Sequence, residues 1–462
     1  MSVVGAIMVP HPPIILPEVG RGEEKKIAAT SAAYEQAAAF VSELNPDTIV
    51  LASPHSIMYS DYFHISPGKA AKGDMGQFRA PQVKFRVEYD TAFVAELTKL
   101  CDETGFPAGT LGERKAELDH GTMIPLYYVN HYDQSYKLVR IGLSGLPLAE
   151  HYRLGKMIQK TADKLGRRVV FIGSGDLSHK LREEGPYGFA KEGPDYDERI
   201  MDVMGRAAFD ELLDFDERFC EKAAECGHRS FCILAGALDG KHLETKRLSH
   251  EGTFGVGYGV CTYNVLGENP DRRLLEKWEA RQSMALMEKR TKEDAFVRLA
   301  RAVINRWVRE RKRLPLPEDL PPEMIELRAG AFVSLHKDGR LRGCIGTIQP
   351  VRSCIAEEIA DNAISAATRD PRFSPVRPEE LDSLEISVDI LSEPEDIRSE
   401  AELDVRRYGV IVSKGSRRGL LLPNLDGVDT VDEQVSIALR KAGISEHEKG
   451  IELQRFEVVR HV

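Results

Sequence analysis

Residues 3–13 read VVGAIMVPHPP, an apolar run that stops at a proline-flanked histidine. A run of this length without polar alternation predicts a strand covered on both faces, as in a parallel sheet between helices. Proline cannot donate a hydrogen bond to a neighbouring strand, so the strand should end at Pro10. We therefore expect His11 at the carboxyl end of a buried first strand.

The same pattern recurs along the first half of the chain. Further strands are predicted at residues 47–52, 137–142, 168–173 and 254–263, and helices at residues 23–44 and 150–165. Strands alternating with helices predict an α/β domain with a central, mostly buried sheet. Residues 66–87 contain several glycines and little apolar periodicity, and they are predicted to form a long loop that could cover a substrate.

A second domain is predicted after the turn-forming sequence LGENPD at residues 266–271. Residues 272–313 are charged and favour helix, and a proline-rich connection follows. Period-two alternation at residues 331–336 and 384–391 predicts strands. We therefore expect an α/β domain at residues 1–266, a helical linker at 267–289, and an α+β domain at 290–462.

Composition excludes several classes of function. The net charge of −10 argues against binding nucleic acid, which relies on positive surface. No apolar run approaches the roughly 20 residues of a membrane span. The seven cysteines have no paired spacing, so we expect reduced thiols in a cytoplasmic protein.

Four histidines carry the chemistry of the first half. His11, His55 in SPHS and His179 in GSGDLSH each follow a predicted strand, and His120 lies in DHGT. Loops at the carboxyl ends of parallel strands converge on one crevice. Several imidazoles in one crevice indicate a metal site, a proton-transfer site or both.

A metal held by His11 and His55 needs a third protein ligand, and the sequence offers two neighbouring candidates. Glu225 would favour Fe(II) and oxygen chemistry, because two histidines and one carboxylate are typical of non-haem iron oxygenases. Cys226 would make a softer site, which suits copper or zinc. Both alternatives stay open at this point.

Together the four histidine motifs resemble class III extradiol dioxygenases of the LigB type and the related Memo proteins, over about residues 1–265. The resemblance implies His11 and His55 as Fe(II) ligands with a glutamate, here Glu225, completing the set. It also implies His179 as the acid/base and His120 as a second histidine that faces the substrate. In Memo proteins a cysteine takes the third-ligand position, which corresponds to Cys226 and would allow zinc or copper instead.

Asp176 lies three residues before His179. It is the carboxylate expected to orient that histidine without itself binding the metal or the substrate. A neutral histidine can remove a proton from a substrate and return it later. His120 is expected to donate a hydrogen bond to bound oxygen or to developing negative charge. Neither His120 nor His179 is needed as a ligand, which favours catalysis over binding alone.

In the second half, LRGCIG at residues 341–346, DPRF at 370–373 and RGLLLP at 418–423 resemble the AMMECR-type domain, over about residues 290–462. The resemblance implies a fold more readily than an activity. It also implies association with a Memo-like protein and a radical-SAM enzyme in a three-part system. Cys344 with Arg342 is a candidate second site, in which nearby arginine would lower the thiol pKa.

These observations lead to one main hypothesis and two alternatives. The main hypothesis is a metal-dependent, extradiol-dioxygenase-like enzyme that takes a small catechol-type aromatic substrate and O2. The first alternative is a Memo-like redox protein without ring cleavage that uses His11, His55 and Cys226. The second is a non-catalytic module that binds a small molecule or peptide. A radical-SAM protein and a second copy of the chain, as a homo-oligomer, are the expected protein partners.

Overall fold

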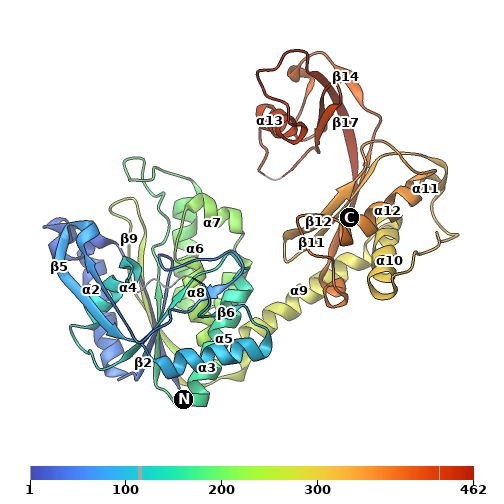
Figure 1. Cartoon of the computed structure of the whole chain (residues 1–462). Helices are drawn as coiled ribbons and strands as arrows, with labels where there is room; N and C mark the ends of the chain where they lie inside the picture. Colours follow the sequence, from blue (N-terminus) through green and yellow to red (C-terminus); the bar gives the residue numbers. More distant parts are fainter. Residues whose placement is uncertain (1, 113–116, 426) are drawn as a thin grey trace. The chain divides into compact units, whose positions relative to one another are not determined.

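The computed structural model describes residues 2–112, 117–425 and 427–462, and the chain separates into two compact units, Met1–Ala280 and Arg281–Val462 (Figure 1). The division falls inside helix α9 (Leu274–Thr291), within the segment predicted as a linker. None of the helices in the described ranges is long and apolar enough to cross a membrane.

The first unit is built on a six-stranded sheet, and this confirms the predicted α/β class. In spatial order the strands are β7 (Lys137–Gly142), β2 (Thr48–Ser53), β8 (Val169–Ser174), β1 (Val3–Val9), β10 (Tyr258–Glu268) and β9 (Lys241–Glu251). The first four are parallel, β10 pairs antiparallel to β1, and β9 pairs antiparallel to β10. Strand β1 is buried at every position, as its unbroken apolar sequence predicts.

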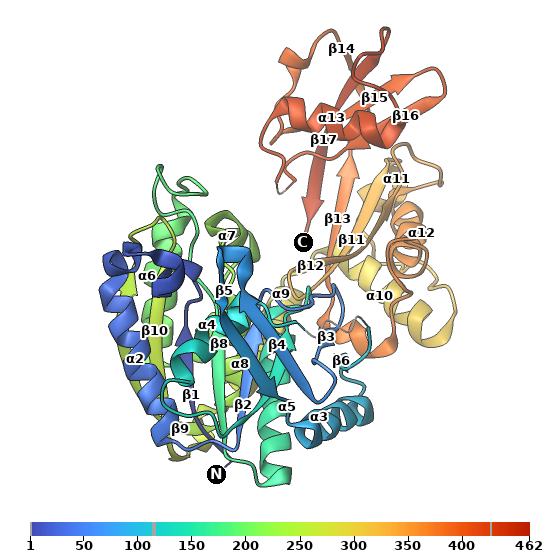
Figure 2. The ribbon, with the colours of Figure 1, turned by 60° about the vertical axis from the view of Figure 1, so that its left-hand side comes forward.

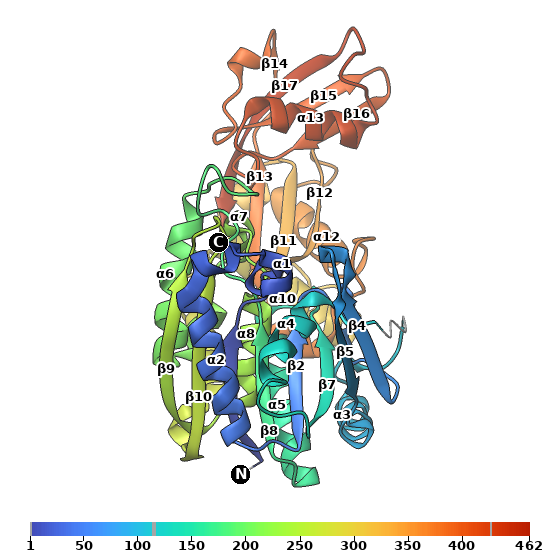
Figure 3. The ribbon, with the colours of Figure 1, turned by 90° about the vertical axis from the view of Figure 1, so that its left-hand side faces the viewer.

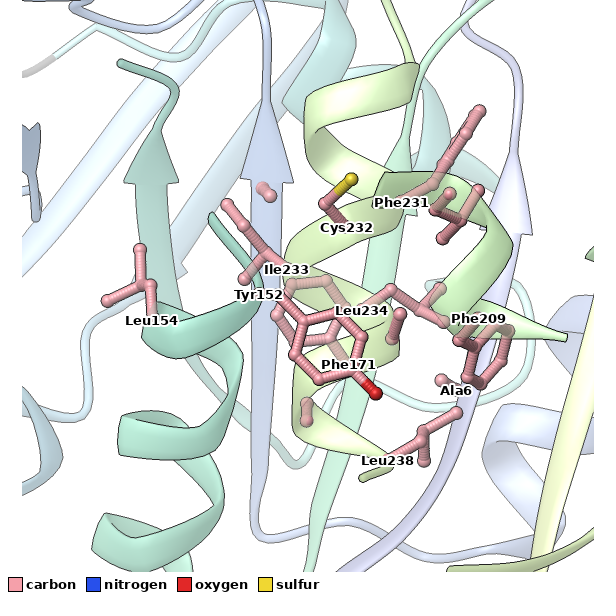
Figure 4. Close-up of a cluster of buried hydrophobic side chains, with 14 of the residues drawn as sticks. Ala6, Tyr152, Leu154, Phe171, Phe209, Phe231, Cys232, Ile233, Leu234 and Leu238 are labelled. Carbon is pink, nitrogen blue, oxygen red and sulfur yellow. The ribbon is translucent and has the colours of Figure 1, made fainter. Parts of the chain in front are cut away.

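Helices cover one face of this sheet. They are α3 (Thr91–Thr104), α5 (Leu148–Leu165), α6 (Glu192–Arg206) and α8 (His228–Ala237). Figure 4 shows Phe171 of β8 among Tyr152 of α5 and Leu234 of α8. Helices α5 and α8 approach closely because Gly155 has no side chain: a Cβ there would lie 2.1 Å from the carbonyl oxygen of Ile233.

The opposite face is covered by α2 (Ala28–Glu43), α4 (His120–Val129) and an antiparallel hairpin of β4 (Ala70–Met75) and β5 (Ala80–Glu88) (Figures 2 and 3). The prediction of a long loop at residues 66–87 is therefore wrong. Gly73, which suggested a loop, marks a close approach instead, since a Cβ there would lie 2.7 Å from the sulfur of Met123. Phe85 and Val87 are buried on the inner side of the hairpin.

The first unit also contains the short elements α1 (Pro17–Gly20), β3 (Phe63–His64), β6 (Ala108–Gly109) and α7 (Glu217–Ala223). Strands β3 and β6 pair in parallel outside the main sheet. Helix α7 matters for the site, because its carboxyl end precedes the candidate ligands Glu225 and Cys226.

The second unit has an antiparallel sheet covered by helices, which confirms the predicted α+β class. The strands, in spatial order, are β12 (Arg340–Gly346), β11 (Ala331–Lys337), β13 (Glu385–Leu391), β17 (Glu452–His461), β15 (Tyr408–Lys414) and β16 (Arg417–Leu421), with β14 (Glu395–Ile397) also paired to β17. The helices are α10 (Ala295–Glu310), α11 (Pro322–Glu326), α12 (Ile355–Thr368) and α13 (Val431–Ala442). Helices α10 and α12 share one core with β11 and β13, and α13 shares another with β15 and β16.

Candidate metal centre

The carboxyl ends of three adjacent parallel strands bring the predicted site residues together. His11 follows β1, His55 follows β2, and Asp176 and His179 follow β8, which lies between β1 and β2. His120 joins them as the first residue of α4. This is the convergence of strand-end loops that the sequence predicts for an open parallel sheet.

His11 is fixed in one orientation and one tautomer. Its backbone N–H donates to Oδ1 of Asp176 at 2.8 Å, and its ring Nδ1 lies 2.9 Å from Oγ of Ser174. The single hydroxyl proton of Ser174 is donated to the carbonyl oxygen of Gly121 at 2.6 Å, so Oγ must accept from Nδ1–H of His11. The buried ring therefore presents the lone pair of Nε2 to the site, as a metal ligand requires.

The donor atoms of His11, His55 and Cys226 have the spacing of ligands that share one cation. Nε2 of His11 lies 3.0 Å from Nε2 of His55 and 3.6 Å from Sγ of Cys226, and the three atoms lie within 4.8 Å of one another. Nitrogens about 2.1 Å from one ion are roughly 3.0–3.4 Å apart, and a nitrogen and a sulfur about 3.6 Å apart. The residues therefore fit a metal ion.

Cys226 reaches the histidines because two glycines allow two loops to touch. A Cβ on Gly175 would lie 2.1 Å from the Cα of Gly227, so any larger residue at position 175 would push the loops apart. With the loops in contact, the amide of Gly227 donates to the carbonyl oxygen of Asp176 at 3.1 Å. In return, the amide of Asp176 donates to Sγ of Cys226 at 3.3 Å, which favours the thiolate that a metal binds.

The structure does not bring Glu225, the first-choice third ligand, to the histidine pair. Its Oε2 accepts from the backbone N–H of His228 at 2.6 Å, at the start of α8. Among the described residues, neither group of clustered ligand atoms contains Glu225, and both contain Cys226. Neighbouring residues point in different directions in this turn, so their order in the sequence could not decide which one faces the metal.

The protonation states suit metal binding by neutral imidazoles. Burial, and then the nearby ring of His55, hold the pKa of His11 well below 6.5, and desolvation lowers the pKa of His55 as well. Burial raises the pKa of the Cys226 thiol well above its ordinary value. At neutral pH the metal-free site therefore holds neutral rings and a thiol, and binding a cation would release the thiol proton.

His179 and Asp176 lie beside the candidate ligands. Nε2 of His179 is 3.9 Å from Oδ2 of Asp176, and the ring stacks on Tyr187 with centroids 5.1 Å apart. Burial raises the pKa of Asp176 to about 6. Burial also lowers the pKa of His179, although the Asp176 carboxylate opposes this. A neutral His179 is thus available to accept a proton at pH 7.

His120 lies against the other rings of the cluster. Its centroid is 4.0 Å from that of His55 and 5.4 Å from that of His11, and Phe78 contacts it edge to face at 5.3 Å. The pKa of His120 is lowered to about 3. Burial is the main cause, and the nearby rings of His55 and His11 contribute in the same direction. A neutral ring can donate one hydrogen bond, which is the role predicted from the sequence.

Sequence reasoning missed the residues that hold the histidines in place. Ser53 donates to Oδ1 of Asp119 at 2.5 Å, and its Oγ accepts from the amide of His55 at 3.2 Å. Asp119 also caps α4 by accepting from the amide of Thr122 at 2.9 Å. An aspartate shortly before an apolar run, here residues 123–129, is a helix-start signal that could have identified Asp119 as the cap. Ser174 carried no such signal.

The second candidate site, in the C-terminal unit, is not assembled as expected. Arg342 pairs with both carboxylate oxygens of Glu380, at 2.9 and 3.0 Å, and is thereby held by another partner. Cys344 accepts from the hydroxyl of Ser334 at 3.2 Å, and its amide donates to Asp370. Burial raises the pKa of the Cys344 thiol, so the prediction of a lowered pKa is wrong.

Comparison with known families agrees with this description. The model of the catalytic LigB subunit of aromatic ring-opening dioxygenase matches residues 5–261, and the AMMECR1 model matches residues 297–461. The first unit has a dioxygenase-like fold with a candidate His/Cys metal site, and the chain belongs to the LigB family. More particularly, it is a two-domain member in which the LigB domain is followed by an AMMECR1 domain.

Individual relatives share this organisation in whole or in part. A protein of Clostridium acetobutylicum is 40% identical over 469 residues, which cover 100% of this chain and 99% of the relative. A protein of Thermotoga maritima is 55% identical over 170 residues, 37% of this chain and 98% of its own length.

Two crystal structures of uncharacterized proteins also match. One, from Pyrococcus horikoshii, is 33% identical and covers 36% of this chain and 88% of its own, with a TM-score of 0.34. The other, from Escherichia coli K12, is 15% identical and covers 56% of this chain and 99% of its own, with a TM-score of 0.35.

The environment of Glu225 predicts a pH-dependent cost in stability. Burial raises its pKa from 4.5 to about 7, so ionisation is harder in the folded than in the unfolded chain. The contribution of Glu225 to the free energy of unfolding is therefore fully present below pH 4.5 and is lost as the pH rises through 7. Relative to Glu225→Gln, the metal-free wild type should lose about 3 kcal/mol of unfolding free energy across this range.

Denaturant titrations of both proteins between pH 4.5 and 8 measure this difference. Glu221→Gln, at an exposed position of α7, is the matched control and should run parallel to wild type. A constant difference between wild type and Glu225→Gln over the whole range would contradict the prediction.

Proposed function

We propose that the chain is a metal-dependent redox protein, in which His11, His55 and Cys226 hold one transition-metal cation. The observation that carries this proposal is the convergence of two imidazole nitrogens and one sulfur on one point, while Glu225 is engaged at the start of α8. The alternative of a redox protein without ring cleavage is thus favoured over the main hypothesis from the sequence.

The donor set indicates which cation to expect. Thiolate selects soft or borderline ions, and imidazole binds zinc, copper, iron and nickel. Two imidazoles with one thiolate therefore favour copper or zinc over the Fe(II) that the LigB resemblance implies. A redox role further favours copper or iron, since zinc has no redox chemistry.

His179 and His120 would act on a small molecule bound next to the cation. When bound, the cation would supply redox chemistry and polarise an adjacent ligand. We expect His179 to accept a proton from that ligand, and its neutral, only partly buried ring supports this role. We expect His120 to donate a hydrogen bond to negative charge that develops there.

A second candidate function is ring cleavage of a catechol by Fe(II) and O2. It is supported by the match to the catalytic LigB subunit of aromatic ring-opening dioxygenase and by the two histidines beside the ligand cluster. A thiolate in place of a carboxylate counts against it, because it makes the site softer.

The expected partners and location are proposals as well. A radical-SAM protein is proposed from the family resemblance, and a homo-oligomer as the state of the chain. A reducing, cytoplasmic compartment is proposed because all seven cysteines are free, and thiols persist where reductants maintain them.

Metal analysis of protein purified without oxygen tests the proposal directly. We expect one copper, zinc or iron per chain, and tight rebinding when the metal-free protein is titrated with Cu(I), Zn(II) and Fe(II). The loaded protein is then mixed with a panel of catechols and oxygen. Yellow ring-opened products would establish the second candidate instead, and failure to bind any of the three cations would end both.

The third ligand can be assigned by comparing two neighbouring variants. Cys226→Ser is expected to lower affinity for Cu(I) or Zn(II) on the order of a hundredfold, because it replaces a soft ligand with a poor one. Glu225→Gln should retain wild-type affinity within a few-fold. Competition titrations with a chromophoric chelator measure both. The reverse pattern would restore Glu225 as the ligand.

A further inference from the structure

A buried carboxylate outside the metal centre holds the loop that carries His179. Asp197 is on α6 and only 2% exposed, on a helix face otherwise made of apolar residues such as Ile200 and Met201. A buried carboxylate needs hydrogen-bond partners to offset its lost hydration. Its Oδ1 accepts from the backbone N–H of Ser178 at 2.8 Å, directly before His179.

The other carboxylate oxygen of Asp197 is engaged by His250. Nε2 of His250 donates to Oδ2 of Asp197 at 2.9 Å, so the histidine fixes the carboxylate that in turn fixes the loop. The carboxylate fits only because residue 257 is glycine, since a Cβ there would lie 2.0 Å from Oδ2. Gly257 therefore leaves the space that Oδ2 occupies, and His250 supplies the hydrogen bond that orients the carboxylate in that space.

The rest of the loop is anchored to the backbone around it. Leu177 donates to the carbonyl oxygen of Gly257, and Gly257 donates to that of Ser178, both at 2.8 Å. The amide of His179 donates to the carbonyl oxygen of Ala223 at 3.2 Å. Asp197 connects this loop to α6, and the same loop carries Asp176, whose carboxylate accepts from the amide of His11.

His250 can be reached from solvent. Its side chain is 27% exposed and lines a cavity of about 450 Å³ together with Arg182, Arg247 and Thr253. Removing the imidazole would therefore extend an existing cavity that small solutes can enter, with little disturbance of the core.

We propose that Asp197 and His250 form a positioning pair that holds the His179 loop in its working conformation. Neither residue is among the candidate ligand groups of the described chain, and both act through the backbone of Ser178. The inference goes beyond the proposed function and does not rest on it, because it concerns the loop and not the chemistry of the cation.

The test measures amide hydrogen exchange of residues 177–181 in the full-length, metal-free chain. His250→Ala should speed exchange in this segment roughly tenfold, since Asp197 loses the donor that orients it. Added imidazole should restore protection by refilling the space. His250→Gln keeps an N–H donor and should remain within about twofold of wild type. His242→Ala, an exposed histidine of the same strand, is the matched control and should show no change.

Three outcomes would contradict the proposed role of Asp197 and His250. They are unchanged exchange at 177–181 in folded His250→Ala, equal acceleration by His242→Ala, or acceleration that neither imidazole nor glutamine reverses. Metal binding is measured separately on the same proteins. A chain that fails to bind metal but shows the expected exchange pattern would reject the proposed function alone, and the opposite result would reject the positioning pair alone.

Discussion

His179→Ala is expected to lower turnover of the cognate substrate about 10²–10⁴-fold while metal content stays at the wild-type level. The imidazole lies beside Asp176 and next to the candidate ligands, and desolvation lowers its pKa, so it is the base available at neutral pH. Removing it takes away a proton acceptor but not a member of the His11, His55 and Cys226 group.

The pH–rate profile gives a second readout of the same substitution. Because the pKa of His179 lies below 6.5, the acidic limb of the wild-type profile should fall below that value and be absent from the variant. His131→Ala, at a half-exposed histidine outside the cluster, is the control. Loss of metal from His179→Ala would instead make His179 a ligand, together with Asp176 and Cys226.

His11→Ala is expected to weaken metal binding a hundredfold or more, the largest effect on affinity of any single change at this site. His11 is central to the donor set, since its Nε2 lies 3.0 Å from the nitrogen of His55 and 3.6 Å from the sulfur of Cys226. Its orientation is also the most tightly fixed, by Asp176 and Ser174.

Elemental analysis and chelator competition measure the loss. Ser174→Ala is a graded control: it removes the acceptor that fixes the tautomer but keeps the ligand, and should weaken binding about 10–100-fold. Stoichiometric metal in folded His11→Ala would show that the three donor atoms do not share a cation, and the proposed centre would then be abandoned.

Local sequence was sufficient for the strands that precede His11, His55 and His179, but it did not predict α4, α7 or α8. Mostly apolar runs that end near proline or glycine predicted β1, β2, β7 and β8 to within a residue at each end. The prediction of a loop at residues 66–87, which contain β4 and β5, is wrong, because Gly73 and Gly76 are also typical of loops. In the structure Gly73 allows the hairpin to lie against Met123, a contact between segments far apart in sequence.

The sequence by itself determined that His11, His55 and His179 follow the ends of buried strands, because strand ends show in local patterns of apolar and turn-forming residues. His120 was expected at the site only from the family resemblance, and the structure places it at the start of α4. Only the tertiary structure decided that Cys226 and not Glu225 faces His11 and His55. That choice depends on Gly175 and Gly227 letting two loops touch and on the start of α8 engaging the carboxylate. Contacts between loops about fifty residues apart set side-chain direction, and no local pattern records them.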